Sequence, residues 1–286
     1  MDRIFQIGDF VFRLCCPEEV MPPENFMKFE CESDSAEYTY QINVSNTLPD
    51  PEGKLIAQRP DLAVFRCETE KRENFECRLI GVKGRPEPYA CYREVTEDRA
   101  EIALVRDEIK ELHIDPMFTS LLALERRLVK KDSMILHCAY VEYQGEAILF
   151  SAPSETGKTT QANLWEKYRG SRTVNGDRSL LGKIDGRWTA QGWPVCGTSE
   201  VCFNETVPIR AVVMLSQAEE NHVEKLSPGR VFPLLYSQIT VNKWNMEDHI
   251  HTMDLIEDFL KKVPVYHLGC TISEEAVDCL ERVLSI

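Results

Sequence analysis

The chain of 286 residues has no apolar run long enough to cross a bilayer, and its first ten residues lack the basic and then apolar layout of a secretion signal. It contains eleven cysteines, but no two are spaced as CxxC. The absence of such ligand pairs argues against a structural zinc site. An odd number of cysteines without a secretion signal indicates reduced thiols rather than a disulfide framework. We therefore expect a cytoplasmic protein that makes no contact with membranes.

Positive charge is also scarce. The chain carries 33 Lys and Arg against 47 Asp and Glu, which gives a formal net charge of −14. Binding of nucleic acid requires clustered cations that neutralise phosphates, so the composition argues against such a partner. Hydrophobic residues make up 43% of the chain, enough for a large buried core in one domain or two. Assembly into a homo-oligomer is left open by these numbers.

Residues 1–115 predict a β-rich domain. Short alternating or aromatic-rich segments are separated there by Pro, Gly and Asp, the residues typical of turns. The clearest period of two is in residues 38–44. We expect strands at residues 4–14, 38–44, 62–67, 75–82 and 102–105.

Residues 116–286 predict a second domain in which helices and strands are mixed, so that the fold class is α/β. The apolar spacing over residues 118–129 predicts one amphipathic helix, and Asp185-Gly186 is a strong signal for a hairpin turn. Further helices are expected at residues 160–168, 231–236, 246–262 and 274–284. Strands are expected at residues 134–141, 147–150, 171–175, 179–184, 187–190, 208–215 and 265–268.

The run Ser151-Ala-Pro-Ser-Glu-Thr-Gly-Lys-Thr-Thr160 joins a predicted buried strand to a predicted helix. A Gly-Lys-Thr turn in this context is typical of a phosphate-binding loop, in which amides at the helix start bind phosphate oxygens. Lys158 is then expected to reach the terminal phosphates and Thr159 to hold magnesium. The predicted cofactors are ATP and Mg²⁺, and the predicted nucleotide-binding residues are Ser154, Glu155, Thr156, Gly157, Lys158, Thr159 and Thr160. The alternative is an ordinary turn with a surface lysine.

The run departs from the full pattern GxxxxGK[ST] in its first glycine, which is Ala152. Glu155 also places a carboxylate in the middle of a loop that receives an anion. Glutamate is expected to remove the backbone freedom of a glycine and to repel the ligand. We therefore expect Glu155 to weaken nucleotide binding.

Two further residues complete a set suited to phosphoryl transfer, which needs a phosphate cradle, a metal ligand and a group that positions the acceptor hydroxyl. Asp177, at the end of a predicted strand, is a candidate ligand of the metal; it could instead only form the turn after Asn175-Gly176. His137 lies on the strand that precedes the loop strand and is a candidate base. A histidine in that position can equally be a core residue with satisfied hydrogen bonds.

Taken together, Leu136-His137, Val141–Gly145, Ile148–Phe150 and Gly157–Thr159 make the chain similar to the catalytic core of HPr kinase. The chain thus resembles the HPr kinase and phosphoenolpyruvate carboxykinase-like P-loop superfamily over roughly residues 115–285, and more loosely in its β-rich start. Asn175–Arg178 and Gly192–Gly197 more closely resemble HPr-kinase-related proteins encoded with bacterial modified-peptide pathways. HPr kinases have two consecutive aspartates where this chain has only Asp177, and their loop has glycine in place of Glu155.

The resemblance implies a P-loop kinase-like domain that transfers the γ-phosphoryl group of ATP to a serine of a peptide or small protein. Lys158, His137 and Asp177 are the catalytic residues that it implies, and Thr159 and Asp177 the magnesium ligands. If Asp177 holds the metal, His137 becomes the candidate base; if Asp177 is the base, Thr159 and phosphate oxygens hold the metal. One alternative is a nucleotide- or peptide-binding protein of the same fold that has lost turnover, and a carboxykinase acting on oxaloacetate is another.

Overall fold

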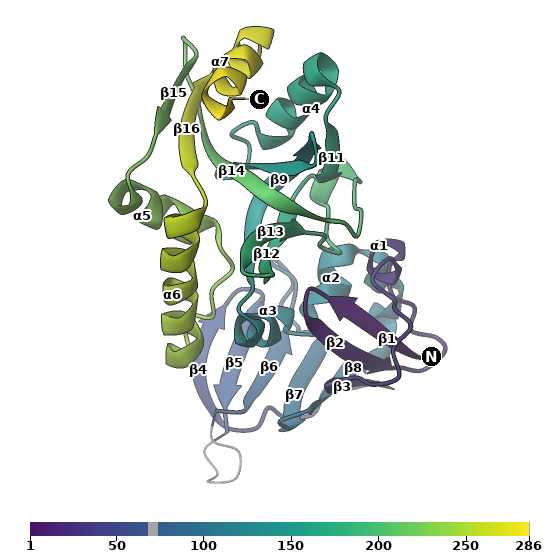
Figure 1. The fold of residues 1–286 in the computed structure, drawn as a ribbon. Coiled ribbons are helices and arrows are strands. Elements are labelled where there is room, and N and C mark those ends of the chain that lie inside the picture. The colour runs from purple at the N-terminus through teal and green to yellow at the C-terminus, as the bar shows by residue number, and fades with distance from the viewer. Residues whose placement is uncertain (68–73, 286) are drawn as a thin grey trace. The chain divides into compact units, whose positions relative to one another are not determined.

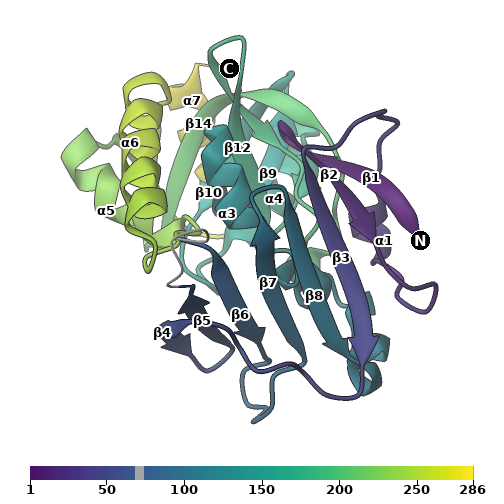
Figure 2. The same cartoon turned by 90° about the horizontal axis from the view of Figure 1, so that it is seen from below.

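A computed structural model describes residues 1–67 and 74–285 of the chain, which separate into two compact units, Met1–Leu124 and Glu125–Ile286. The first unit is built on one sheet with the strand order β1-β2-β3-β8-β7-β6-β5-β4. Figure 2 shows β6, β7, β8 and β3 side by side. The strands are β1 (Asp2–Ile7), β2 (Phe10–Cys15), β3 (Tyr38–Ser45), β4 (Lys54–Arg59), β5 (Leu62–Arg66), β6 (Glu76–Ile80), β7 (Ala90–Thr96) and β8 (Arg99–Val105).

One face of this sheet carries an aromatic core. Alternate residues of a strand point to the same face, which places Phe10 and Phe12 of β2 with Tyr38 and Tyr40 of β3. The helices of the unit are α1 (Glu24–Met27), the 3₁₀ segment η1 (Arg106–His113) and α2 (Asp115–Ser120). Phe26 of α1 meets Phe118 of α2 at a ring separation of 4.8 Å. Both rings are fully buried or nearly so.

Two predicted elements are wrong in the same way, because each is predicted as one continuous element where the chain turns. The strand predicted over residues 4–14 is two antiparallel strands, since Gly8 adopts a φ of 60° and turns the chain between β1 and β2. The helix predicted over residues 118–129 breaks at Ala123, whose φ is 46°, into α2, α3 (Leu124–Leu128) and the 3₁₀ turn η2 (Val129–Lys131). Residues 121–124 are all buried, so burial does not follow the single stripe of a regular helix.

In the second unit, five strands pair in a closed circuit, β9-β12-β13-β14-β10, in which β10 pairs again with β9. The two long strands make this closure possible. β9 (Met134–Tyr143) pairs with β12 through its first four residues and with β10 through the rest, and β14 (Thr206–Gln217) passes in the same way from β13 to β10. The other strands are β10 (Glu146–Ser151), β11 (Arg172–Asn175), β12 (Arg178–Ile184), β13 (Arg187–Gln191), β15 (His222–Lys225) and β16 (Val265–Cys270).

Helices pack on both sides of the part of this sheet that β9, β10 and β14 form (Figure 1). Because side chains alternate along β10, Ile148 and Phe150 pack in a core with α4 (Lys158–Arg169) and α7 (Glu274–Leu284), while Leu149 packs in a core with α5 (Pro228–Gln238) and α6 (Met246–Lys262). The 3₁₀ turn η3 (Gly197–Ser199) lies in the loop before β14.

The bounds predicted for α6 and α7 and the hairpin at Asp185-Gly186 are confirmed. The predicted α/β class is confirmed in its coarse form, since the protein is mixed α/β and contains two β-sheets. No helix in the described part of the chain is long and apolar enough to cross a membrane.

Candidate active site

The site begins at the turn between β10 and α4. β10 runs parallel to β14, so the turn lies at the carboxyl end of both strands, the edge where α/β proteins bind ligands. Gly157 has a φ of 114° and no side chain caps the start of the twelve-residue helix α4. The first helical hydrogen bond runs from the amide of Gln161 to the carbonyl of Gly157 at 2.9 Å. The amides before Gln161 therefore lack helical acceptors and can donate to an anion.

The structure corrects the expectation that Glu155 removes the backbone freedom of a glycine from this turn. The φ of Glu155 is 65°, so the backbone adopts the left-handed conformation that favours glycine even though the residue is glutamate. The side chain is exposed, like those of Ser154 and Thr159, whereas Thr156 and Thr160 are half-buried. The glutamate thus leaves the shape of the turn intact, and its carboxylate lies in water.

Lys158 is folded into the turn. The residue is only 8% exposed, and its Nζ donates to the carbonyl oxygens of Ala152 at 3.1 Å and Pro153 at 3.3 Å. Burial lowers the pKa of this lysine, and the charge of Asp177 opposes that change. The ammonium group is therefore held by weak neutral acceptors, which a phosphate could replace.

Asp177 lies in the bend between β11 and β12, and the bend is held by Asn175. The Asn175 side chain is fully buried. Its Nδ2 donates to the carbonyls of Trp193 at 2.8 Å and Val195 at 3.1 Å, and its Oδ1 accepts from the amides of Asp177 and Arg178, both at 2.9 Å. Sequence reasoning quoted Asn175 only as part of a motif and missed this role.

The Asp177 carboxylate is thereby presented at one quarter exposure, beside the Arg178 Nε at 3.1 Å. Gly197 backs it closely, because a Cβ added there would lie 3.2 Å from Oδ1 of Asp177. Oxygen donors such as this carboxylate and the Thr159 hydroxyl are of the chemistry that Mg²⁺ accepts when phosphates complete its shell. In the described residues no hydrogen bond joins Thr159 to Asp177, and no group of three His, Cys, Asp or Glu side chains could hold a metal.

His137 lies opposite Asp177, because β12 pairs with β9 and places Arg178 across from His137. The distance from His137 Nε2 to Asp177 Oδ1 is 3.7 Å. On the other side of the ring, Nδ1 is 3.1 Å from Oε1 of Gln238, the last residue of α5. An amide oxygen only accepts, so Nδ1 carries the proton and Nε2 of the neutral ring carries the lone pair.

Electrostatics keep this imidazole neutral. Burial is the largest effect that lowers the pKa of His137, and the charge of Lys158 lowers it further; the Gln238 hydrogen bond and Asp177 act in the opposite direction without reversing the shift. Gln238 was not found by sequence reasoning, since it is 101 residues from His137 and belongs to no motif. The charges of Asp177 and Lys158 therefore both act on the ring of His137, so the three side chains lie near one another.

The fold and this site define a mixed α/β protein with a lysine-bearing turn at a strand-to-helix junction, next to a histidine and an aspartate. The model of the family described as SynChlorMet cassette protein ScmC matches residues 103–285, and the chain belongs to this family. Among solved structures, the Hpr(Ser) kinase/phosphatase from Coxiella burnetii is similar at 10% identity with a TM-score of 0.32, over 53% of this chain and 93% of that chain. No curated protein matches the sequence.

Proposed function

We propose that this protein is an ATP-dependent phosphotransferase that moves the γ-phosphoryl group to a serine hydroxyl of a peptide or small protein, within a P-loop kinase-like domain. The observation that carries the proposal is the separation of 3.7 Å between His137 Nε2 and Asp177 Oδ1, beside the turn that holds Lys158. Phosphoryl transfer is chiefly positioning and charge stabilisation, and this group of residues offers both. The family's description as a cassette protein supports an acceptor encoded beside it.

Each residue has a separate task in this proposal. The amides of Gly157–Thr160 bind the β-phosphate, and Lys158 leaves the carbonyls of the turn to neutralise charge on the transferred group. The Thr159 hydroxyl and the Asp177 carboxylate would hold Mg²⁺, which supplies charge neutralisation when bound.

The hydrogen bond from His137 Nδ1 to Gln238 favours His137 over Asp177 as the base. Nε2 accepts the serine proton while the serine oxygen forms a bond to the γ-phosphorus, and the bond from that phosphorus to the bridging oxygen of ADP breaks. The imidazolium that results lies beside the Asp177 carboxylate, which stabilises it. ADP and the phosphoserine product then leave.

The test uses purified full-length protein with Mg·ATP and the peptides encoded beside its gene, together with a set of unrelated serine peptides. The expected result is the mass increase of one phosphate on a serine, which is lost when Mg²⁺ is chelated and forms about 10²-fold more slowly in Lys158→Ala. Magnesium-dependent ATP binding without transfer to any of these peptides would instead support the second candidate.

That second candidate is a nucleotide- or peptide-binding protein of the same fold without turnover. Two contacts favour it, the Lys158 Nζ held by the carbonyls of Ala152 and Pro153 and the Asp177 carboxylate paired with Arg178. Both groups are then engaged in contacts of the protein itself. The nucleotide-binding form of this candidate differs from the first in phosphoserine formation alone, and its peptide-binding form also predicts that ATP does not bind.

A further inference from the structure

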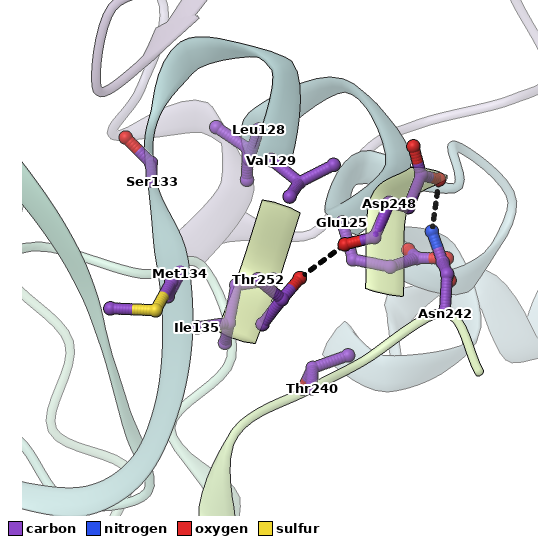
Figure 3. A pocket seen from close by; sticks show the side chains of 10 residues that line it. All are labelled: Glu125, Leu128, Val129, Ser133, Met134, Ile135, Thr240, Asn242, Asp248 and Thr252. Atoms are coloured by element: carbon purple, nitrogen blue, oxygen red, sulfur yellow. Dashed lines mark hydrogen bonds between the residues drawn. The ribbon is translucent and has the colours of Figure 1, made fainter. Parts of the chain in front are cut away.

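A small cavity lies behind the site, at the start of β9. Its volume is about 10 Å³, the room of a single water molecule. Figure 3 shows the side chains that line it. They come from three parts of the second unit: the α3–β9 region, the segment Thr240–Asn242 and the first turns of α6.

Asn242 presents an unpaired acceptor at this cavity. The residue is 3% exposed, and its Nδ2 donates to Oδ2 of Asp248 at 3.2 Å (Figure 3). A carboxylate only accepts, so this contact fixes the amide orientation and turns Oδ1 away from Asp248. Oδ1 has no hydrogen-bond partner among the described residues. A buried acceptor of this kind normally has one.

Thr252 offers a second partner. Its hydroxyl donates to the backbone oxygen of Asp248 at 2.7 Å and can therefore still accept. A water in the cavity would donate to Asn242 Oδ1 and to Thr252 Oγ1, which gives it the two partners that a buried water needs. The carboxylates of Glu125 and Asp248 also line the cavity, and Nη1 of the buried Arg126 contacts Asp248 at 3.2 Å, so a monovalent cation is the alternative occupant that the first test separates from water.

The segment above the cavity leads directly to the active site. Ile239 pairs with Leu136 of β9, and the Thr240 amide donates to the carbonyl of Ile135 at 3.0 Å. Gln238, which precedes them, binds His137. Any movement of residues 239–242 away from β9 therefore moves the group that sets the protonated nitrogen of His137.

We propose that the cavity binds one structural water and that Asn242, through this water, is a positioning residue for His137. The water joins Asn242 to Thr252 of α6 and holds residues 239–242 against β9, which keeps Gln238 on Nδ1. The positioning role rests on the proposed function, because only there is His137 the base. The water and the tautomer themselves are measured without turnover, so they can be tested even if phosphoryl transfer fails.

The first test is a crystal structure of the unsubstituted full-length protein that resolves ordered water. We expect one water within hydrogen-bond distance of Asn242 Oδ1 and Thr252 Oγ1. An empty cavity overturns the proposal, and so does a bound ion, which a rise in melting temperature specific to K⁺ or Na⁺ would also reveal. This measurement needs no variant and stands even if a substitution prevents folding.

The second test follows the tautomer of His137 by the ¹⁵N shifts of its ring above its pKa. Gln238→Leu should shift the population from Nδ1–H toward Nε2–H, and Asn242→Leu and Thr252→Val should each cause part of the same shift. The matched control is Asn221→Leu, an asparagine of the same unit that binds Thr271 instead. An unchanged tautomer in folded Asn242→Leu protein, or an equal change in Asn221→Leu, would show that Asn242 has no positioning role.

Discussion

The two turns that form the candidate site are held in opposite ways. The bend at Asp177 is fixed by four hydrogen bonds of the buried Asn175 side chain, none of which involves a group that the proposed reaction uses. The turn between β10 and α4 is held instead by Lys158, a residue that the proposed reaction uses directly. The acid is therefore placed in advance, as is the histidine through Gln238, whereas the turn that we propose binds phosphate would have to exchange its own contacts for those of the ligand. Preorganisation of the first kind lowers the cost of reaching the transition state.

The largest effect is expected for His137→Gln, which removes the base from the preorganised side. Turnover should fall by about 10²–10⁴-fold while ATP affinity persists, since base catalysis typically contributes that much. Single-turnover transfer and ATP titration measure the two quantities. A loss of thermal stability without a loss of turnover would return His137 to the role of a core residue.

The pH dependence sharpens this prediction. Burial and Lys158 lower the pKa of His137 below 6.5, so turnover should fall as the pH drops through that lowered pKa and should be level above 6.5. The sign for stability is the same. The unfolded chain binds this proton more tightly, so the contribution of His137 to stability is present above 6.5 and is lost as the pH falls. In His137→Gln this part of both profiles should disappear.

Lys158→Ala acts on the adaptable side. The loss of charge on the transferred group should cost about 3 kcal/mol of barrier, or roughly 10²-fold in turnover. The fold should persist, because the lost hydrogen bonds go to two carbonyls of a surface turn. Lys167→Ala, an exposed lysine of the same helix, is the control in transfer and melting measurements. Unchanged turnover in folded Lys158→Ala protein would remove the site assignment.

Asn175→Ala breaks the preorganised bend itself. Two carbonyls and two amides lose their partner at a buried position, so the free energy of unfolding should fall by about 2–3 kcal/mol. Turnover should fall as well, while binding of inorganic tripolyphosphate, a probe for the phosphate site that we propose at the other turn, should change little. Denaturant unfolding and calorimetry separate these effects. If tripolyphosphate binding fell as much as turnover, the two turns would not be independent.

Asp177→Asn has a smaller expected effect on binding. An amide is a weaker magnesium ligand than a carboxylate, so the magnesium-dependent part of ATP affinity should fall by about tenfold, or roughly 1.4 kcal/mol. ATP titrations with and without Mg²⁺ measure that part directly. Equal ATP affinity with and without magnesium in the unsubstituted protein would contradict a metal-binding role for Asp177.

Glu155→Gly should have the smallest effect. Its carboxylate is exposed, so at about 8 Å in water the repulsion of each phosphate charge is about 0.5 kcal/mol before screening. Glycine also relieves the left-handed backbone at this position. ATP binding should therefore tighten a few-fold at low salt, and the gain should shrink as salt rises. Weaker binding would mean that the carboxylate contacts the metal or the acceptor.

The local elements of this fold could be predicted, because their signals are contained within them. The apolar spacing gave the bounds of α6 and α7, and Asp185-Gly186 supplied the positive φ that its hairpin needs. Gly8 carried the same kind of signal, but the alternation of residues 4–14 continues across it and conceals the turn. Ala123 gives no signal, since alanine is the best helix former and breaks the helix only through its surroundings.

The partners of the site residues were beyond sequence reasoning, because they are set by tertiary structure. Asn175 reaches carbonyls 18 and 20 residues away, and Gln238 reaches His137 across 101 residues. The structure places His137, Asp177 and Lys158 of the run from Ser151 to Thr160 near one another. Neither periodicity nor spacing could indicate that the lysine would hold its own turn or that an amide would fix the histidine.

The closed circuit of β9, β12, β13, β14 and β10 has a consequence for how much sequence change the protein tolerates. None of these strands can separate without losing hydrogen bonds to two neighbours, so the framework is specified by residues far from the turns. The turns at its ends are therefore free to vary in composition. The turn that contains Ala152 and Glu155 joins a strand fixed by pairing to a helix, and Lys158 holds it from within, so Glu155 adopts a left-handed φ although it is not glycine. Substitutions in these turns can therefore change or remove the chemistry at this edge of the sheet with little loss of stability.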